Sequence, residues 1–396
     1  MTTAERIKVE PAVLRWARTT AGYDVDGAAR RLGIKSDALA RWEAGERSPT
    51  IGQLRRAAST FKRPLAALLL SEPPTEPELP RDFRGLRQQS GDSWSPALHA
   101  EFKRARLQRE VFLELLDLSP QSLGLATGEL PLATGLSPES VGQILRSELG
   151  MDDLPVSTWG KPSDLLNSII DGTERLGILV IQTARVSPAE MQGFSISERP
   201  YPLIALNGKD SPRRKLFTLL HELGHVVLNV SGMCDPAESW NRPDVGDTTE
   251  MFCNETAAAI LMPKDHLLRD PLVTERAVNH LWTLSELRVL SQRFGASSEA
   301  VLLRLVRLRA AQWQNYSLRK PEFDEEYERY RMRDEEHKRK SKGGPNYYTL
   351  KVRDLGRGYV SYVLDAFSND AISSRAVATY LDVRFDQLDK LERRVS

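Results

Sequence analysis

The segment best equipped for chemistry is the pentapeptide HELGH at residues 221–225. It lies within a stretch from Ser211 to about residue 230 that predicts a helix, and residues four positions apart share one helical face. His221 and His225 can therefore bind one zinc ion through their imidazoles. Glu222 can take a proton from a water molecule that the metal activates. This spacing is typical of zinc-dependent peptidases.

The residues around the pentapeptide favour a metal site. They are largely apolar, and include Leu216, Phe217, Leu219, Leu220, Val226 and Val227. Burying two histidines and a glutamate in such surroundings would be costly without a metal ion or polar partners. A metal centre is therefore favoured over histidines that are merely packed in a core or exposed at the surface.

A third protein ligand is expected, because zinc enzymes usually hold the metal through three protein groups. A third histidine six residues after His225 is excluded, since that position is Ser231. The alternative is an acid on a later helix, and Glu250 opens a predicted helix from about residue 249. Asn254 shares a face with Glu250, so one can bind zinc while the other orients a ligand. We predict Glu250 as the ligand and Asn254 as the orienting residue.

Three further residues in the same region are alternative ligands: Cys253, Glu255 and His266. A cysteine thiolate would reduce the Lewis acidity that hydrolysis needs. Its more ordinary role is that of a small buried residue. Glu250 therefore remains the preferred ligand.

Residues 8–72 predict an all-α module of short helices separated by Gly22, Gly33 and Gly45. Ser36 suits the position that caps the third of these helices. Two short helices joined by a glycine turn and flanked by supporting helices are typical of a helix-turn-helix domain. The candidate DNA contacts, mostly cations suited to phosphate groups, are Arg30, Arg31, Lys35, Ser36 and Arg41.

The amino-acid totals restrict the class of protein. A chain of 396 residues suits two or three domains, and 40% hydrophobic with 28% charged residues allows folded cores. The formal net charge of +1 means that any DNA contact must come from a local basic patch. Two cysteines, no signal peptide and no apolar run of about 20 residues predict a soluble cytoplasmic protein.

The fold class expected is multi-domain, with the helix-turn-helix module, an α+β zincin-like domain and a small helical tail. Strands are predicted at 177–181, 191–197 and 202–206, and the last of these is expected to pair with an extended peptide substrate. The segments after residue 72 are a Pro-rich spacer and helical connector (73–160), the HExxH peptidase domain (161–312), a charged helix or linker (313–344) and a C-terminal helical domain (345–396). Helices of the connector could pack against either neighbour.

These motifs together resemble the ImmA/IrrE family of zinc metallopeptidases. The resemblance is carried by the pentapeptide, Glu250, Cys253-Asn254, Ala257-Ala258, Leu261-Met262-Pro263 and the lead-in at 207–212. It implies that His221, His225 and Glu250 bind zinc and that Glu222 is the catalytic base. It also implies site-specific cleavage of a regulatory protein, often a repressor. Thr256 departs from the aromatic residue of many members, which affects helix packing and leaves the ligands untouched.

The N-terminal module resembles the Xre/Cro-type helix-turn-helix through Trp42-Glu43-Ala44-Gly45 and Pro49. Val25 stands where such domains often carry a glutamine that contacts phosphate, and Asp37 brings negative charge near the groove. DNA binding and protein docking therefore both remain open for this module. The stretch 372–391 has a residue pattern similar to that of the helix-turn-helix module, but a helical hairpin is the favoured interpretation.

Two functions follow from these features. The first is a zinc endopeptidase that cleaves a repressor or toxin-type partner in a stress, mobile-element or toxin–antitoxin circuit. The second is a DNA-binding regulator or antitoxin whose peptidase-like domain acts as a sensor or docking surface. The intact set of His221, Glu222, His225 and Glu250 favours the first, because a scaffold needs no base beside a zinc site.

Overall fold

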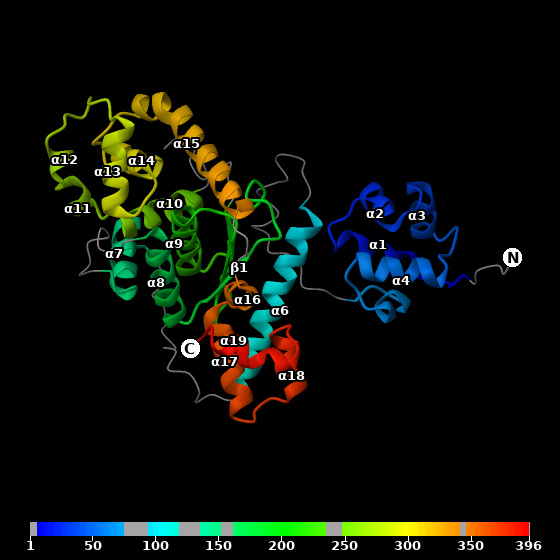
Figure 1. The fold of residues 1–396 in the computed structure, drawn as a ribbon. Coiled ribbons are helices and arrows are strands. Elements are labelled where there is room, and N and C mark those ends of the chain that lie inside the picture. Colours follow the sequence, from blue (N-terminus) through cyan, green and yellow to red (C-terminus); the bar gives the residue numbers. More distant parts are fainter. Residues whose placement is uncertain are drawn as a thin grey trace. The chain divides into compact units, whose positions relative to one another are not determined.

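The computed structural model describes residues 6–74, 94–118, 135–151, 161–234, 248–340 and 346–395. Most of the predicted Pro-rich spacer and the glycine break at 343–345 lie outside these ranges. The chain forms two compact units, Met1–Arg104 and Ala105–Ser396 (Figure 1). No helix within the described ranges is long and apolar enough to cross a bilayer.

The first unit contains the predicted helix-turn-helix fold. Its elements are α1 (Pro11–Thr19), α2 (Val25–Leu32), α3 (Ser36–Glu43), α4 (Ile51–Thr60) and the 3₁₀ helix η1 (Leu65–Leu69). Their apolar faces enclose a small core that includes Leu14, Leu32, Leu39, Trp42, Leu54 and Phe61. The buried Arg18 guanidinium donates two hydrogen bonds to the Glu43 carboxylate, at 2.6 and 2.9 Å, which joins α1 to α3.

Local signals explain where these helices begin and end. Asp24 caps α2 by accepting a hydrogen bond from Gly27 N at 2.6 Å, and Gly33 ends the helix in the left-handed region. Ser36 does not cap α3 as expected, because the helix begins at Ser36 itself. Its hydroxyl instead donates to Asp26 Oδ1 at 2.5 Å, which ties α3 to the start of α2.

The second unit has the predicted α+β architecture. A four-stranded sheet is formed by β1 (Leu179–Thr183), β2 (Gly193–Ile196), β3 (Leu203–Asn207) and β4 (Met233–Cys234), in the order β1-β3-β2-β4. Strand β3 pairs in parallel with β1 and antiparallel with β2. The expectation that 202–206 pairs with a peptide substrate is therefore wrong, because both edges of this strand are already used.

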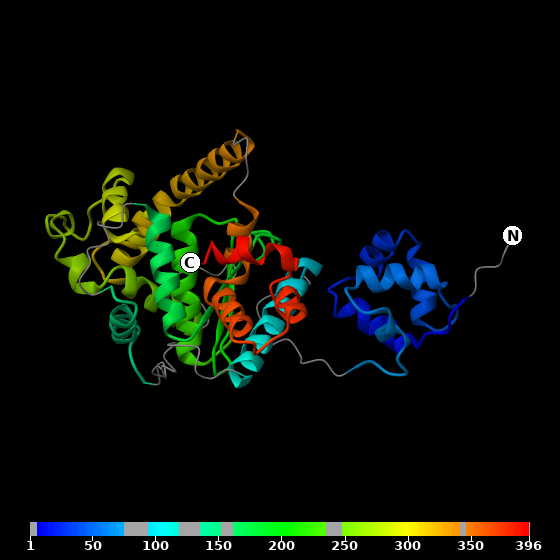
Figure 2. The same ribbon diagram turned by 60° about the horizontal axis from the view of Figure 1, so that its bottom comes forward.

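Helices before and after the sheet build the core of this unit. They are α7 (Pro138–Glu148), α8 (Pro162–Arg175), α9 (Pro212–Leu228), α10 (Thr248–Leu261), α11 (Lys264–Leu268), α12 (Pro271–Thr274), α13 (Leu284–Phe294) and α14 (Ser298–Arg307). Helices α8 and α9 pack on the sheet, and α10 packs on α9 (Figures 1 and 2). Helix α7 packs on α10 at Gly142, where a Cβ atom would lie 2.6 Å from Ala259 Cβ. Helix α7 of the predicted connector thus belongs with the second unit.

The charged segment after the core forms one long helix, α15 (Trp313–Lys340). It is anchored to the start of α9, because the Tyr327 hydroxyl donates to Asp210 Oδ1 at 3.1 Å. The Arg214 guanidinium lies over the Tyr327 ring at 3.6 Å. Burial raises the pKa of Asp210, which Arg214 partly opposes. Tyr327 of this charged segment therefore holds α15 against the start of α9.

The C-terminal residues form α16 (Tyr347–Leu355), α17 (Arg357–Ser368), α18 (Ser374–Tyr380), η3 (Phe385–Gln387) and α19 (Leu388–Glu392). They pack on the second half of α6 (Pro96–Leu118), and the Tyr362 hydroxyl donates to Leu115 O at 3.2 Å (Figure 2). Helices α16 and α17 also lie against β1. The tail is helical, as predicted.

A buried carboxyl group joins this tail to the sheet. Glu174, at the end of α8, accepts a hydrogen bond from Gly358 N, with both oxygens within 3.2 Å. Gly356 allows the approach, because its φ is +86° and a Cβ atom there would lie 2.4 Å from Val180 O. Burial raises the pKa of Glu174 to about 7, and the hydrogen bonds from Gly358 and Val180 oppose the shift only in part.

The raised pKa of Glu174 predicts a pH-dependent stability. An ordinary glutamate titrates near 4.5, so between about 4.5 and 7 the folded chain holds a proton that the unfolded chain has lost. Stability should therefore fall as pH rises through this window, by roughly 3 kcal/mol in total. Glu174→Gln, which resembles the protonated acid, should remove this dependence. Calorimetric melting across pH checks the difference, with exposed Glu148→Gln as the control; equal pH slopes for the wild type and Glu174→Gln would contradict it.

Candidate metal centre

The centre is built where α9 and α10 lie side by side. Helix α9 begins at the Ser211 cap, whose side chain accepts from Arg214 N at 3.3 Å, and it carries the whole HELGH pentapeptide in its buried part. Gly224 permits the close approach, because a Cβ atom there would lie 3.0 Å from Cys253 Cα. Glu250 stands in the first turn of α10, facing the two histidines.

Three ligand residues converge at this point. His221 Nε2 and His225 Nε2 are 3.2 Å apart. Glu250 Oε2 lies 3.2 Å from the first nitrogen, and Glu250 Oε1 lies 3.1 Å from the second. Both histidines are buried, and the Glu250 side chain is 15% exposed. The predicted set His221, His225 and Glu250 is thus brought together, and within the described ranges it is the group whose donor atoms all lie within 4.8 Å of one another.

These distances fit a tetrahedral metal ion. Ligand atoms bound at about 2.0–2.1 Å in tetrahedral geometry are separated by about 3.3 Å. The nearest donor atoms of each pair of these residues are 3.1–3.2 Å apart, with a different Glu250 oxygen facing each histidine. The Asn254 carbonyl oxygen accepts a hydrogen bond from His221 Nδ1 at 3.0 Å. This fixes the tautomer that leaves the Nε2 lone pair of His221 directed toward Glu250. Asn254 therefore lies where the sequence predicted an orienting residue.

The electrostatics of the cluster also suit a cation. Burial alone would lower the pKa of His221, but its contact with Glu250 more than offsets this and raises the pKa. Burial likewise opposes ionisation of Glu250, yet the two histidines hold its pKa far below its usual range. The cluster therefore stabilises positive charge at the meeting point of the three ligands, which is the charge that a divalent ion supplies.

The alternative ligands are used elsewhere. Cys253 is buried and packs against Gly224, which agrees with its interpretation as a small core residue. Glu255 forms an ion pair with Arg307 at 3.3 Å, and His266 is exposed on α11. None of the three belongs to the convergent group.

Glu222 is fully buried beside the ligands. Burial raises its pKa, and the two histidines and a hydrogen bond from the Ser195 hydroxyl oppose the shift. Ser195 lies on β2, and its oxygen also accepts from Gly232 N at 3.3 Å. Gly193 makes room for the helix, because a Cβ atom there would lie 2.5 Å from a Thr218 methyl carbon.

Sequence reasoning missed the role of Ser195. Gly193 and Ser195 are two positions apart in a predicted strand, so they lie on the same face of it. That face therefore carries a hydroxyl group next to a position that has no side chain. A small and a polar residue on a strand face next to a helix that contains the metal ligands would have been a usable signal.

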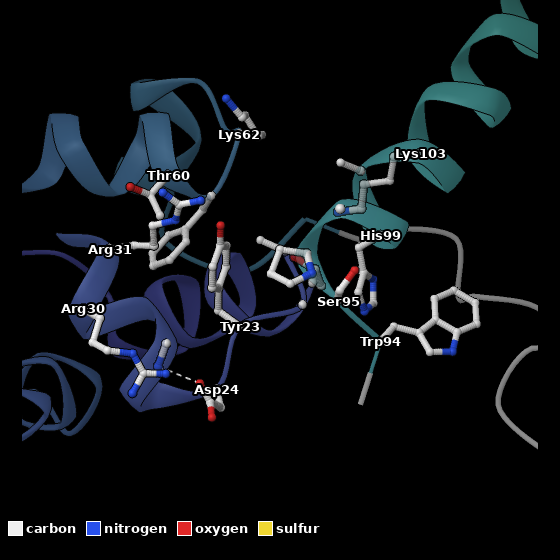
Figure 3. Close-up of a pocket in the computed structure, with 18 residues that line it drawn as sticks. Tyr23, Asp24, Arg30, Arg31, Thr60, Lys62, Trp94, Ser95, His99 and Lys103 are labelled. Atoms are coloured by element: carbon white, nitrogen blue, oxygen red, sulfur yellow. Dashed lines mark hydrogen bonds between the residues drawn. The ribbon is translucent and has the colours of Figure 1, made fainter. Parts of the chain in front are cut away.

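The predicted DNA contacts separate into two groups. Lys35, Ser36 and Arg41 lie on or beside α3, whereas Arg30 and Arg31 lie on α2 and line a cavity (Figure 3). On α3 the Arg41 guanidinium pairs with Asp37 at 3.1 Å, and Ser36 is bonded to Asp26. The α3 surface therefore carries acids beside the cations that would contact phosphate.

Comparisons with known proteins agree with both units. Residues 173–306 match the IrrE N-terminal-like domain of peptidase family M78, and residues 14–68 match a helix-turn-helix domain. The chain is 30% identical over 105 residues to the radiation response metalloprotease IrrE of Deinococcus radiodurans. That match covers 26% of this chain and 30% of the relative. The chain thus combines a helix-turn-helix domain with an IrrE-like metallopeptidase domain.

The geometry predicts how metal retention depends on the third ligand. Glu250→Gln should weaken metal binding by roughly 10–100-fold or more, because it removes an anionic ligand. Cys253→Ala should leave the metal content unchanged, since the thiol packs against Gly224 and is not part of the convergent ligand group. Elemental analysis of the purified proteins after dialysis measures both. Loss of metal from the cysteine variant, with retention by the glutamate variant, would contradict the assignment of Glu250.

Asp37 on α3, which pairs with Arg41, predicts that DNA binding is weak and can be strengthened. Asp37→Ala should raise affinity for duplex DNA several-fold at low salt. The substitution removes a carboxylate that repels the DNA phosphates, and it frees Arg41 to contact them. Fluorescence anisotropy over a salt series measures the change. Glu72→Ala is the control, because it removes the same charge from an exposed position outside α3. Equal gains for both variants would show that only net charge matters.

Proposed function

We propose that the chain is a zinc-dependent endopeptidase that cleaves a regulatory protein at one or a few bonds. The observation that carries the proposal is the convergence of His221, His225 and Glu250 at tetrahedral spacing, with buried Glu222 beside them. The match to an IrrE-like peptidase domain supports the same reaction class. Zinc is favoured over other metals because two imidazoles and one carboxylate form a typical catalytic zinc set.

The residues of the chain divide the work of peptide hydrolysis. His221, His225 and Glu250 would hold the metal, which lowers the pKa of a water molecule towards about 7 and polarises the scissile carbonyl. Glu222 takes the proton of the attacking water and passes it to the leaving amine nitrogen. Its buried position makes the carboxylate a stronger base than an exposed glutamate.

The substrate class follows from the combination of units. A helix-turn-helix domain can place the peptidase beside proteins bound to DNA, and a repressor or toxin-type partner is such a client. The matched relative is described as a radiation response metalloprotease, which supports a stress circuit for this chain. Narrow substrate choice also follows from physiology, because broad proteolysis would damage the compartment that holds the enzyme.

The second candidate is a DNA-binding regulator whose peptidase-like domain senses a signal or docks a partner. The helix-turn-helix match favours it. Against it stand the retained base Glu222 and the acids Asp26 and Asp37 next to the DNA-facing helix. If a Glu222→Gln chain still regulated its target genes in cells, this second candidate would be favoured.

Glu222→Gln is expected to keep its metal and to lose cleavage by roughly 100- to 10,000-fold, since only the proton-transferring group is changed. Such a variant should hold its clients without consuming them. Proteins that it captures from stressed cells can be identified by mass spectrometry and then exposed to the wild type. His221→Ala, which should lose the metal, is the control for capture that does not need the site.

Specific cleavage of a captured protein by the wild type would support the proposal. Capture of no specific protein by Glu222→Gln, or broad digestion of unrelated proteins by the wild type, would overturn it.

A further inference from the structure

A cavity of about 830 Å³ lies within the first unit, away from the metal ligands in sequence. It is lined by the α1–α2 turn, α2, the α4–η1 turn and the start of α6 (Figure 3). Its volume is in the range of small-molecule binding sites. None of the residues assigned to peptide hydrolysis contributes to it.

Cationic side chains dominate its polar lining. Arg30 and Arg31 come from α2, Lys62 from the α4–η1 turn, and Lys103 from α6. Within the described part of the chain, Arg30, Arg31 and Lys62 have no ion pair or side-chain hydrogen bond. Like charges gathered around a cavity repel one another, and a bound anion relieves that repulsion.

One acid stands against four cations among the residues that line this cavity, so it offsets only part of their charge. Asp24 is the acidic residue among those that line it, and its carboxylate is hydrogen-bonded to Gly27 N at 2.6 Å as the cap of α2. The cap role holds Asp24 at the helix start, where it stabilises α2. The residues that line the cavity therefore carry a net positive charge.

The wall opposite α2 is closely fitted. Gly22 has a φ of +76°, and a Cβ atom there would lie 2.4 Å from His99 Cδ2, so only glycine lets the imidazole approach. The buried Trp94 ring lies 5.4 Å from the His99 ring and supports it. Tyr23 stands between the two walls, with its ring 6.1 Å from Phe61 (Figure 3). The cavity thus offers cations on one side and aromatic surface on the other.

We propose that this cavity binds a small phosphate-bearing molecule. Its phosphate groups lie against Arg30, Arg31 and Lys62, because guanidinium and ammonium groups bind phosphate through charge-assisted hydrogen bonds. The less polar part of the molecule packs on Tyr23. The inference reassigns Arg30 and Arg31 from DNA contact to ligand binding, and it does not depend on the proposed peptidase activity.

Calorimetric titration of the full-length chain at low salt tests the site. The probes are inorganic tripolyphosphate, ATP and adenosine. ATP and tripolyphosphate should bind with saturation at one molecule per chain, whereas adenosine, which lacks phosphate, should not. Replacing both Arg30 and Lys62 by Ala should weaken binding of the two phosphate probes by roughly tenfold or more.

Two matched double variants act as controls. Arg55→Ala with Arg56→Ala removes two exposed cations of α4 that do not line the cavity, and binding should be unchanged. Lys35→Ala with Arg41→Ala removes the cations of the α3 surface and should also have no effect. All variants retain the metal ligands, so any heat from chelation of the metal by phosphate is common to them.

Absence of saturable binding by both phosphate probes would overturn the proposal. Equal loss in the α4 control pair would show unspecific attraction to net charge and would also overturn it. Loss in the α3 pair instead of the cavity pair would place the anion on the DNA-facing surface. Because the measurement is of binding alone, its failure is separate from a failure of the peptidase assignment.

Discussion

The close approach of α9 and α10 is the constraint on which the metal centre depends. The ligands come from two helices, so their atoms can converge only if the backbones nearly touch. Gly224 inside the motif makes this possible, because any side chain there would meet the backbone of Cys253. Burial makes the arrangement costly unless the polar groups are satisfied, and a metal ion satisfies three of them at once. The hydrogen bond between His221 Nδ1 and Asn254 also crosses this interface between α9 and α10.

The sheet supplies the other wall of the site through a second close approach. A Cβ atom at Gly193 would meet Thr218, and one at Gly232 would meet the His225 ring at 2.6 Å. Strand β2 and the residue before β4 can therefore approach α9 this closely only as glycines. This brings the Ser195 hydroxyl to Glu222. The turn that follows β2 is itself held, because buried Arg109 of α6 donates to the carbonyls of residues 198, 200 and 201 at 2.7–2.9 Å. The position of Glu222 on α9 thus depends also on α6, a helix distant in sequence.

Sequence patterns predicted what depends on local spacing. The i, i+4 histidines and the glycine-punctuated helices of the first unit follow from short-range geometry. Glu250 is the chosen ligand because Ser231 excludes a third histidine and because the motifs resemble a known family. Strand order does not, because it is set by pairing between distant segments. For this reason the 202–206 strand was expected at an edge and lies inside the sheet. For the same reason the sequence grouped Arg30 and Arg31 of α2 with the cations of α3, although the two helices present them on different surfaces.

The distribution of charge in the first unit bears on how DNA binding and the proposed peptidase activity could coexist in one chain. The chain has almost no net charge, so affinity for DNA must come from local cations. On α3 the cation Arg41 is offset by Asp37, whereas Arg30 and Arg31 of α2 line a cavity. A strongly basic recognition helix would retain the chain on DNA of any sequence, because phosphate contacts carry no sequence information. Acids beside α3 would weaken that unspecific retention, which the proposed cleavage of separate protein clients requires.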